Sequence, residues 1–197
     1  SFNRLIYSIH YDIIRGSNDP LFFMRIGIMC SGNGTNFENI VKQCPDHEVV
    51  LMIHNTKKCG AIERAERLGI HHCRIKHKDV DNAINLFKVW KVDLIVLAGY
   101  MRILSPKMIE AFPNKIINIH PSLLPKYKGI DAIQQALDSG DKTTGCTVHY
   151  VNEELDSGEI IDQSTVMICP DDTIETLTQR VQQAEHRLLP LVINSYE

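Results

Sequence analysis

From residue 25 onward, short apolar runs alternate with longer amphipathic stretches, and this alternation limits the fold more than any other feature. Strands that alternate with helices build βαβ units and a parallel sheet. The predicted strands are residues 26–30, 49–54, 72–75, 94–98, 116–119, 146–151 and 160–167, and the predicted helices are residues 36–43, 61–68, 80–89, 106–111, 132–137 and 174–195. We therefore predict an α/β fold with a mostly parallel, doubly wound sheet, helices on both faces and a short antiparallel edge.

The first 23 residues stand apart from this pattern in a chain of 197 residues, which has the length of one domain. Leu5, Ile9 and Ile13 repeat there at helical spacing. We interpret residues 1–23 as an N-terminal extension that docks on the surface or on a second subunit, because chain ends are usually peripheral, with a targeting role as the alternative. We expect the extension to be dispensable for chemistry, because every motif described below follows Met24.

Charge and cysteine content exclude several classes of function. The chain carries 21 Lys and Arg against 24 Asp and Glu, so it has no global positive field that would hold a nucleic acid. The six cysteines are widely spaced and include no Cys-x-x-Cys pair, which favours reduced thiols in a cytoplasmic protein over a zinc site. No apolar stretch approaches the roughly 20 residues of a membrane span. A local anion pocket remains compatible with this composition.

A glycine-containing loop at residues 31–36, Ser-Gly-Asn-Gly-Thr-Asn, joins the first predicted strand to the first predicted helix. Glycines let backbone N–H groups approach a ligand closely, and a helix N-terminus attracts negative charge. The loop lacks the Gly-Lys-Ser/Thr of a Walker loop and the third glycine of the dinucleotide fingerprint. Its position favours a phosphate monoester site, with a purely structural tight turn as the alternative.

A second motif places an amide and an imidazole at the end of a predicted strand. Asn118 and His120 lie on the same face, because alternate strand residues share a side, and Pro121 then ends the strand. An amide donor beside an imidazole suits the stabilisation of an anionic tetrahedral oxygen. A histidine with only a structural hydrogen bond is the alternative.

Six motifs, taken in order, resemble those of phosphoribosylglycinamide formyltransferases. They are SGNGTN at 31–36, AGYMRIL at 98–104, NIHPSLLP at 118–125, TVHYV at 147–151, ELDSG at 154–158 and EH at 185–186. Each motif alone is a weak signal, but the ordered set is specific and covers residues 24–197.

The resemblance implies an enzyme with the formyltransferase fold, which transfers the formyl group of 10-formyltetrahydrofolate to the amine of glycinamide ribonucleotide in purine biosynthesis. It implies small-molecule substrates, no metal, no nucleic-acid or membrane partner, a cytoplasmic location, and a monomer or homodimer. Residues 24–115 would form the phosphate-binding half and residues 116–197 the catalytic and folate-binding half.

The resemblance also implies roles for individual residues. Asn118 and a protonated His120 would stabilise the oxyanion, and Asp156 would raise the proton affinity of His120 and help to move the amine proton. The residues implied for the ribonucleotide are Gly34, Thr35, Asn36, Gln182 and Glu185, and those implied for the folate are Met101, Arg102, Ile103, Leu104, Asn118 and Asp156. His149 is expected to support the site without carrying a proton.

Some of these assignments have plain alternatives. Without the resemblance, Glu185 is interpreted as part of a solvated helix face, and Arg102 as a surface cation after the fourth strand. Two features depart from the family pattern, namely the extension and Asp162, a carboxylate where an apolar strand residue is expected. The second departure puts the register of the last strand in doubt.

Three competing functions remain to be weighed. A methionyl-tRNA formyltransferase should carry an RNA-binding domain and a basic surface, whereas this chain ends at residue 197 with a net charge of -3. A formyltetrahydrofolate hydrolase would use water as the acceptor and would have no use for a phosphate loop. A non-catalytic nucleotide-binding regulator would not need Asn118, His120 and Asp156 together. We expect the ribonucleotide formyltransferase activity.

Overall fold

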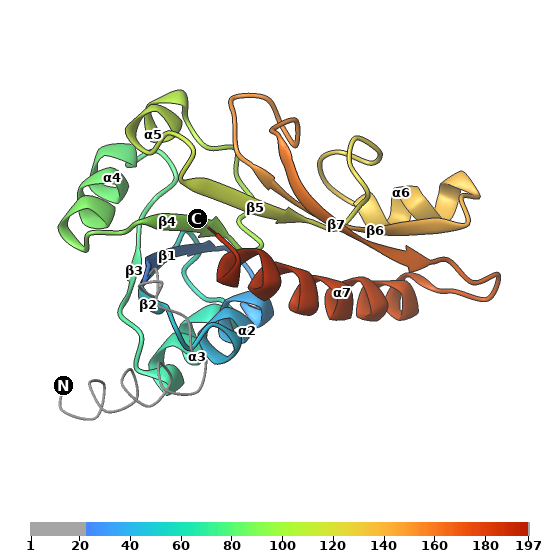
Figure 1. Ribbon diagram of the computed structural model, residues 1–197, viewed down its shortest axis with the longest axis horizontal. Helices are drawn as coiled ribbons and strands as arrows, with labels where there is room; N and C mark the ends of the chain where they lie inside the picture. The colour runs from blue at the N-terminus through green and yellow to red at the C-terminus, as the bar shows by residue number, and fades with distance from the viewer. Residues whose placement is uncertain (1–22, 197) are drawn as a thin grey trace, which may run out of the picture.

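The molecule is built around a seven-stranded sheet with the strand order β3-β2-β1-β4-β5-β6-β7 (Figure 1). The computed structural model describes residues 23–196, so the prediction for the N-terminal extension lies outside the described residues. The strands are β1 (Arg25–Cys30), β2 (Glu48–His54), β3 (His72–Arg74), β4 (Leu94–Leu97), β5 (Ile116–His120), β6 (Thr143–Tyr150) and β7 (Ile160–Met167). The helices are α2 (Thr35–Gln43), α3 (Gly60–Leu68), α4 (Val80–Val89), α5 (Pro106–Ala111), α6 (Ala132–Ser139) and α7 (Ile174–Asn194).

Strand directions confirm the predicted α/β class. Strands β1 to β5 are parallel, whereas β6 runs antiparallel to β5 and β7 antiparallel to β6. The antiparallel edge is longer than expected, because β6 and β7 have eight residues each. Strand β6 begins at Thr143, before the predicted start, because residues 143–145 pair with residues 165–167 of β7. Their Thr-Thr-Gly sequence carries no apolar alternation, so periodicity could not detect them.

Side chains alternate along each parallel strand and supply an apolar core on either face of the sheet. In β1, Ile26 and Ile28 belong to the core covered by α2, α3 and α7, whereas Met29 belongs to the core covered by α4 and α5. Figure 1 shows these two groups of helices on opposite sides of the sheet. The doubly wound arrangement therefore follows from strands that are apolar on both faces.

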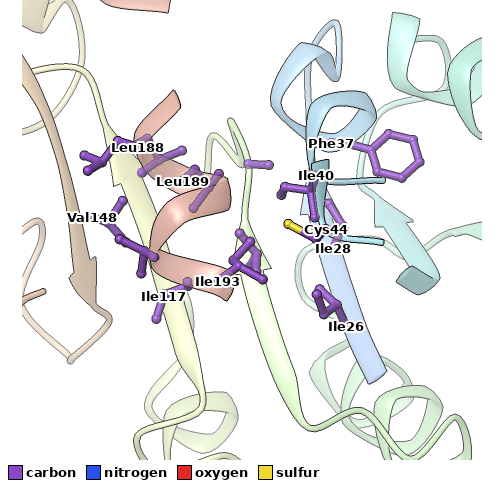
Figure 2. Packing of buried hydrophobic residues seen from close by; sticks show 14 of the residues in the cluster. Ile26, Ile28, Phe37, Ile40, Cys44, Ile117, Val148, Leu188, Leu189 and Ile193 are labelled. Atoms are coloured by element: carbon purple, nitrogen blue, oxygen red, sulfur yellow. The ribbon is translucent and has the colours of Figure 1, made fainter. Parts of the chain in front are cut away.

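Helix α7 closes the first core along much of the sheet. Leu188, Leu189 and Ile193 of α7 lie against Ile117 and Val148 of the neighbouring strands β5 and β6 (Figure 2). Each such buried side chain contributes about 1.5–3 kcal/mol relative to an exposed one. The C-terminal helix is thus held in place by the same sheet that carries the motif at residues 118–120.

An ion cluster joins the two helices that flank the loop at residues 31–34. Glu38 of α2 is buried and contacts Lys42 at 2.6 Å on its own helix, together with Arg64 and Arg67 of α3. The Arg64 Nε also donates a hydrogen bond to the Asn33 carbonyl at 2.8 Å. These contacts fix α3 against the loop.

The register of β7 at Asp162 is defined by its pairing with β6. Asp162 lies opposite Val148, next to an irregularity between Val148 and His149, and its side chain is exposed on the outermost strand. Its Oδ1 accepts a hydrogen bond from the Gln163 N–H at 2.7 Å. A carboxylate is tolerated at this position because an edge strand keeps part of its surface in water.

Candidate active site

Three loops that carry the sequence motifs lie side by side, because β1, β4 and β5 are neighbours in the sheet. The loop at residues 31–34 follows β1, the segment at residues 98–105 follows β4, and the segment at residues 121–131 follows β5. The carboxyl ends of parallel strands are the usual location of ligand sites in open α/β sheets.

The first loop and the start of α2 form a narrow corner, called the anion corner below because its backbone could bind an anion. Gly34 is the N-cap of α2 and has a φ of 72°, a left-handed conformation that favours glycine. A Cβ at this position would lie 2.7 Å from the Ala61 Cβ and 2.8 Å from its Cα. The N–H groups of the first turn of α2, from Thr35 onward, have no partner within the helix, so they can bind an anion.

Glu185 faces this corner from α7. Its carboxylate Oε2 accepts a hydrogen bond from the Asn36 Nδ2 at 2.9 Å, and the residue is only 7% exposed. Burial raises the pKa of Glu185 to about 7, although the hydrogen bond from Asn36 opposes the rise. The interpretation of Glu185 as part of a solvated helix face is therefore wrong. Gln182, one turn earlier on α7, is exposed.

The side chain of Asn36 has a second polar atom, its Oδ1, which needs a hydrogen-bond donor. Its Oδ1 is buried and has no hydrogen-bond partner among the described residues. Leaving a buried acceptor unpaired costs about 1–3 kcal/mol. A ligand with a hydrogen-bond donor would remove that cost.

Asn118 is oriented by a histidine of the adjacent antiparallel strand. Its Nδ2 lies 3.1 Å from the Nε2 of His149, whose Nδ1 lies 2.8 Å from the Tyr150 carbonyl. A carbonyl can only accept, so the Nδ1 of His149 carries hydrogen and the Nε2 accepts from Asn118. This arrangement leaves the second hydrogen of the Asn118 amide available for another acceptor.

His120 is buried between a backbone carbonyl and a carboxylate. Its Nε2 donates to the Tyr127 carbonyl at 2.8 Å, and its Nδ1 lies 3.4 Å from the Oδ2 of Asp156. Burial lowers the pKa of His120 below its usual 6.5, although the bond to Tyr127 and the charge of Asp156 act in the opposite direction. In the free protein, burial therefore favours the neutral ring more than Asp156 favours the charged ring, and the protonated His120 expected beside the oxyanion stays a prediction.

Asp156 reaches His120 from a turn that folds back over the sheet. Because β6 is antiparallel, it ends beside the start of β5, and the Val151 N–H bonds to the Ile116 carbonyl. The following turn then returns along β5, where the Gly129 N–H donates to the Oδ2 of Asp156 at 2.8 Å. Asp156 therefore does not come from the carboxyl end of a parallel strand, but it contacts a residue that does.

Asp156 is held in its ionised form. Burial opposes ionisation, but hydrogen bonding, which the Gly129 N–H supplies at 2.8 Å, and the charge that the neighbouring imidazoles carry when protonated outweigh it and keep the pKa of Asp156 below its usual range. The His149 Nε2 lies 3.7 Å from the second carboxylate oxygen. Asp156 has a φ of 46°, a conformation that aspartate and asparagine adopt more readily than most residues.

The segment after β4 presents apolar side chains to solvent beside these groups. Met101 is 75% exposed and Ile103 is 58% exposed, whereas Leu104 is buried. Arg102 is exposed as well. Exposed apolar side chains next to polar groups are typical of a surface that binds a flat, partly apolar ligand.

Two groups in the site escaped the sequence interpretation. The Tyr127 carbonyl and the Gly129 N–H are backbone atoms, which have no residue-type signature. The nearest signal was the Lys-Tyr-Lys-Gly run at residues 126–129, where a glycine indicates a turn.

Two features are absent from residues 23–196. That part of the chain contains no cluster of three or more His, Cys, Asp or Glu side chains arranged to hold a metal ion. None of its helices combines the length and the apolar character needed to span a bilayer.

Comparison with known proteins gives consistent relatives. The phosphoribosylglycinamide formyltransferase of Haemophilus influenzae is 39% identical over 180 residues, covering 86% of this chain and 85% of that protein. The Bacillus subtilis enzyme of the same name is 41% identical over 180 residues, covering 86% and 92%. The chain spans only 18% of a chicken (Gallus gallus) relative, the trifunctional purine biosynthetic protein adenosine-3, at 41% identity.

Solved structures and a family model agree with these relatives. Glycinamide ribonucleotide transformylase 1 from Symbiobacterium toebii superposes with a TM-score of 0.86 at 37% identity, covering 90% of this chain and 91% of that chain. The model of the formyl transferase family matches residues 24–193. The chain therefore belongs to the formyltransferase family.

Proposed function

We propose that the chain transfers the formyl group of 10-formyltetrahydrofolate to the primary amine of glycinamide ribonucleotide, a step of purine biosynthesis. One observation carries the proposal: Asn118, His120 and Asp156 converge at the edge of the sheet that also carries the N-terminus of α2. The names of the full-length relatives support the choice of substrate.

The ribonucleotide would bind through both of its ends. Its phosphate would accept hydrogen bonds from the backbone of Gly34, Thr35 and Asn36 at the start of α2. Glu185, and Gln182 after a change of side-chain conformation, would contact the sugar and the amine end. The unpartnered Oδ1 of Asn36 supports this placement, because it needs a donor such as a hydroxyl or an amine.

The folate would bind against the exposed apolar segment after β4. Met101, Ile103 and Leu104 supply apolar surface, and Arg102 can face a carboxylate of the folate tail. Asn118 and Asp156 would lie at the reacting end of the folate.

The reaction needs no covalent enzyme intermediate. The amine nitrogen attacks the formyl carbon, a C–N bond forms, and the electron pair of the carbonyl moves to oxygen. The free Nδ2 hydrogen of Asn118 can donate to this oxyanion in a site shielded from water. His149 contributes indirectly, because it fixes the orientation of the amide.

His120 and Asp156 would handle the proton. His120 is neutral in the free protein, and its Nδ1, which faces Asp156, is the nitrogen able to accept the proton lost by the attacking amine. The resulting imidazolium would be paired with the ionised Asp156 and would add positive charge near the oxyanion. The C–N bond to the folate then breaks, and the proton passes to the departing folate nitrogen.

Several broader expectations belong to the same proposal. We expect small-molecule substrates only, no metal ion, a cytoplasmic location, and a monomer or homodimer. We also keep the division into a phosphate-binding half at residues 24–115 and a catalytic and folate-binding half at residues 116–197.

One assay tests the reaction directly. The protein is incubated with 10-formyltetrahydrofolate and, in parallel, with glycinamide ribonucleotide, with methionyl-tRNA, or with water alone as acceptor. Loss of the formyl-folate should require glycinamide ribonucleotide. Equal loss with water alone would show a hydrolase, and loss that depends on methionyl-tRNA would show the other transferase; either result would overturn the proposal.

A further inference from the structure

Ser31 joins the two loops that the proposed function assigns to different substrates. Its backbone N–H donates to the Gly99 carbonyl at 3.0 Å, which extends the pairing between β1 and β4 beyond both strands. Its side-chain hydroxyl accepts a hydrogen bond from the Met101 N–H at 2.9 Å. The residue that opens the anion-binding loop therefore also binds the segment after β4.

The hydroxyl holds a segment that has little other support. Gly99 has a φ of 73°, which turns the chain out of the sheet, and the side chains of Met101 and Ile103 are largely exposed. Side-chain packing therefore restrains residues 101–103 weakly, between Tyr100, which packs against the core covered by α4 and α5, and the buried Leu104. The Gly99 bond holds the start of this segment, and the bond from the Met101 N–H to the Ser31 hydroxyl fixes the position of Met101 relative to the anion-binding loop.

We propose that the Ser31 hydroxyl is a positioning group that couples the binding of the two substrates. The inference rests on the proposed function, in which the phosphate binds at residues 34–36 and the folate against residues 101–104. A phosphate bound to the first turn of α2 restrains the loop from Ser31 onward, and the hydroxyl passes that restraint to Met101. By reciprocity, the folate would restrain the anion-binding loop to the same extent.

The coupling matters because the two substrates react with each other. The amine is carried by the ligand of one loop, and the formyl carbon by the ligand of the other. The relative position of the loops therefore sets the distance between the reacting atoms, and small misplacements of reactants are costly. One hydrogen bond is worth about 2- to 10-fold in affinity, which is the coupling expected here.

The test measures the coupling itself, in the full chain. The dissociation constant of tetrahydrofolate, which carries no formyl group and cannot react, is measured by calorimetry with and without saturating glycinamide ribonucleotide. In the wild type, the ribonucleotide should tighten tetrahydrofolate binding about 2- to 10-fold. Ser31→Ala should bring this factor closer to one, because only the backbone bond to Gly99 then joins the loops, and Ser31→Thr, which keeps the hydroxyl, should retain it.

A control and a second measurement exclude a purely structural effect. Ser105→Ala also removes a serine hydroxyl that accepts a backbone N–H, that of Met108 at 3.3 Å, but at the start of α5. It should lower stability and leave the coupling factor unchanged. In the wild type, glycinamide ribonucleotide alone should slow hydrogen exchange at the Met101 amide, a result that does not depend on any variant folding.

The inference and the proposed function can fail separately. If the wild type formylates glycinamide ribonucleotide but Ser31→Ala keeps the full coupling factor, the inference is wrong and the function stands. An unchanged Met101 exchange rate in the presence of bound ribonucleotide would also overturn it. A wild type that does not formylate the ribonucleotide would overturn the proposed function first.

Discussion

Replacing Glu185 by glutamine should stabilise the protein above neutral pH. Burial raises the pKa of Glu185 from the usual 4.5 to about 7, so the folded protein binds this proton more tightly than the unfolded chain does. The free energy of unfolding therefore falls as pH rises from about 4.5 to about 7, and this loss remains at higher pH. At about 1.36 kcal/mol per pKa unit, the loss is about 3 kcal/mol.

Glu185→Gln keeps the shape of the side chain and an oxygen that can accept the hydrogen bond from Asn36, but it cannot ionise. At pH 8 the variant should unfold with a free energy up to about 3 kcal/mol higher than the wild type. At pH 4.5 or below the two proteins should be nearly equal, because Glu185 is then protonated. Binding of glycinamide ribonucleotide should weaken despite the gain in stability, because the negative charge is lost.

The measurement is urea-induced unfolding across this pH range. Glu110→Gln serves as the control, because it makes the same substitution at an exposed position on α5 and should leave the pH dependence unchanged. If wild type and Glu185→Gln show the same pH dependence of unfolding, Glu185 does not bear the cost of ionising a buried carboxylate, and the reasoning is refuted.

Three further predictions concern the site. Asp156→Asn should lower kcat about 10²- to 10⁴-fold with little change in the KM for glycinamide ribonucleotide, because asparagine tolerates the same backbone conformation but has no charge. Steady-state kinetics in which KM changed more than kcat would contradict this. The pKa of the His120 ring, measured by NMR, should lie below 6.5, and it should be lower still in Asp156→Asn, which lacks the carboxylate that raises the pKa of His120. A higher pKa of His120 in Asp156→Asn would be inconsistent with this. Gly34→Ala should lower the unfolding free energy by about 1–3 kcal/mol and raise the KM for the ribonucleotide, because residue 34 has a left-handed conformation and the added Cβ would meet Ala61. No change in either the unfolding free energy or the KM would argue against the anion corner.

The parallel part of the fold could be predicted because local pattern and tertiary role coincide there. Strands β1, β2, β4 and β5 carry apolar residues on both faces, so periodicity and composition give the same answer. Two motifs could likewise be located, because the loop at residues 31–34 directly follows a strand and the motif at residues 118–120 forms the end of one. The first residues of β6 were missed because their pairing with β7, and not their own sequence, makes them a strand.

The contacts within the site were less predictable. The distance between His120 and Asp156 depends on a turn that folds back across β5, and no local pattern records such a path. Burial of Glu185 could not be foreseen either, because an acidic residue on a helix is solvated far more often than it is buried. The resemblance to a known family singled out all three residues without indicating how they meet.

The ion cluster around Glu38 has a consequence for how fast a phosphorylated molecule arrives. One carboxylate faces three cations there, and Glu63 and Glu66 on α3 offset the two remaining positive charges, so the two helices are nearly balanced in a chain whose net charge is -3. Exposed Lys57 and Lys58, on the adjacent connection between β2 and α3, therefore give the surface near the anion corner its local positive charge. An anion is therefore attracted to this part of a molecule whose net charge is negative. Its rate of association should fall as added salt shortens the range of the electrostatic field, which is about 10 Å at 0.1 M ionic strength.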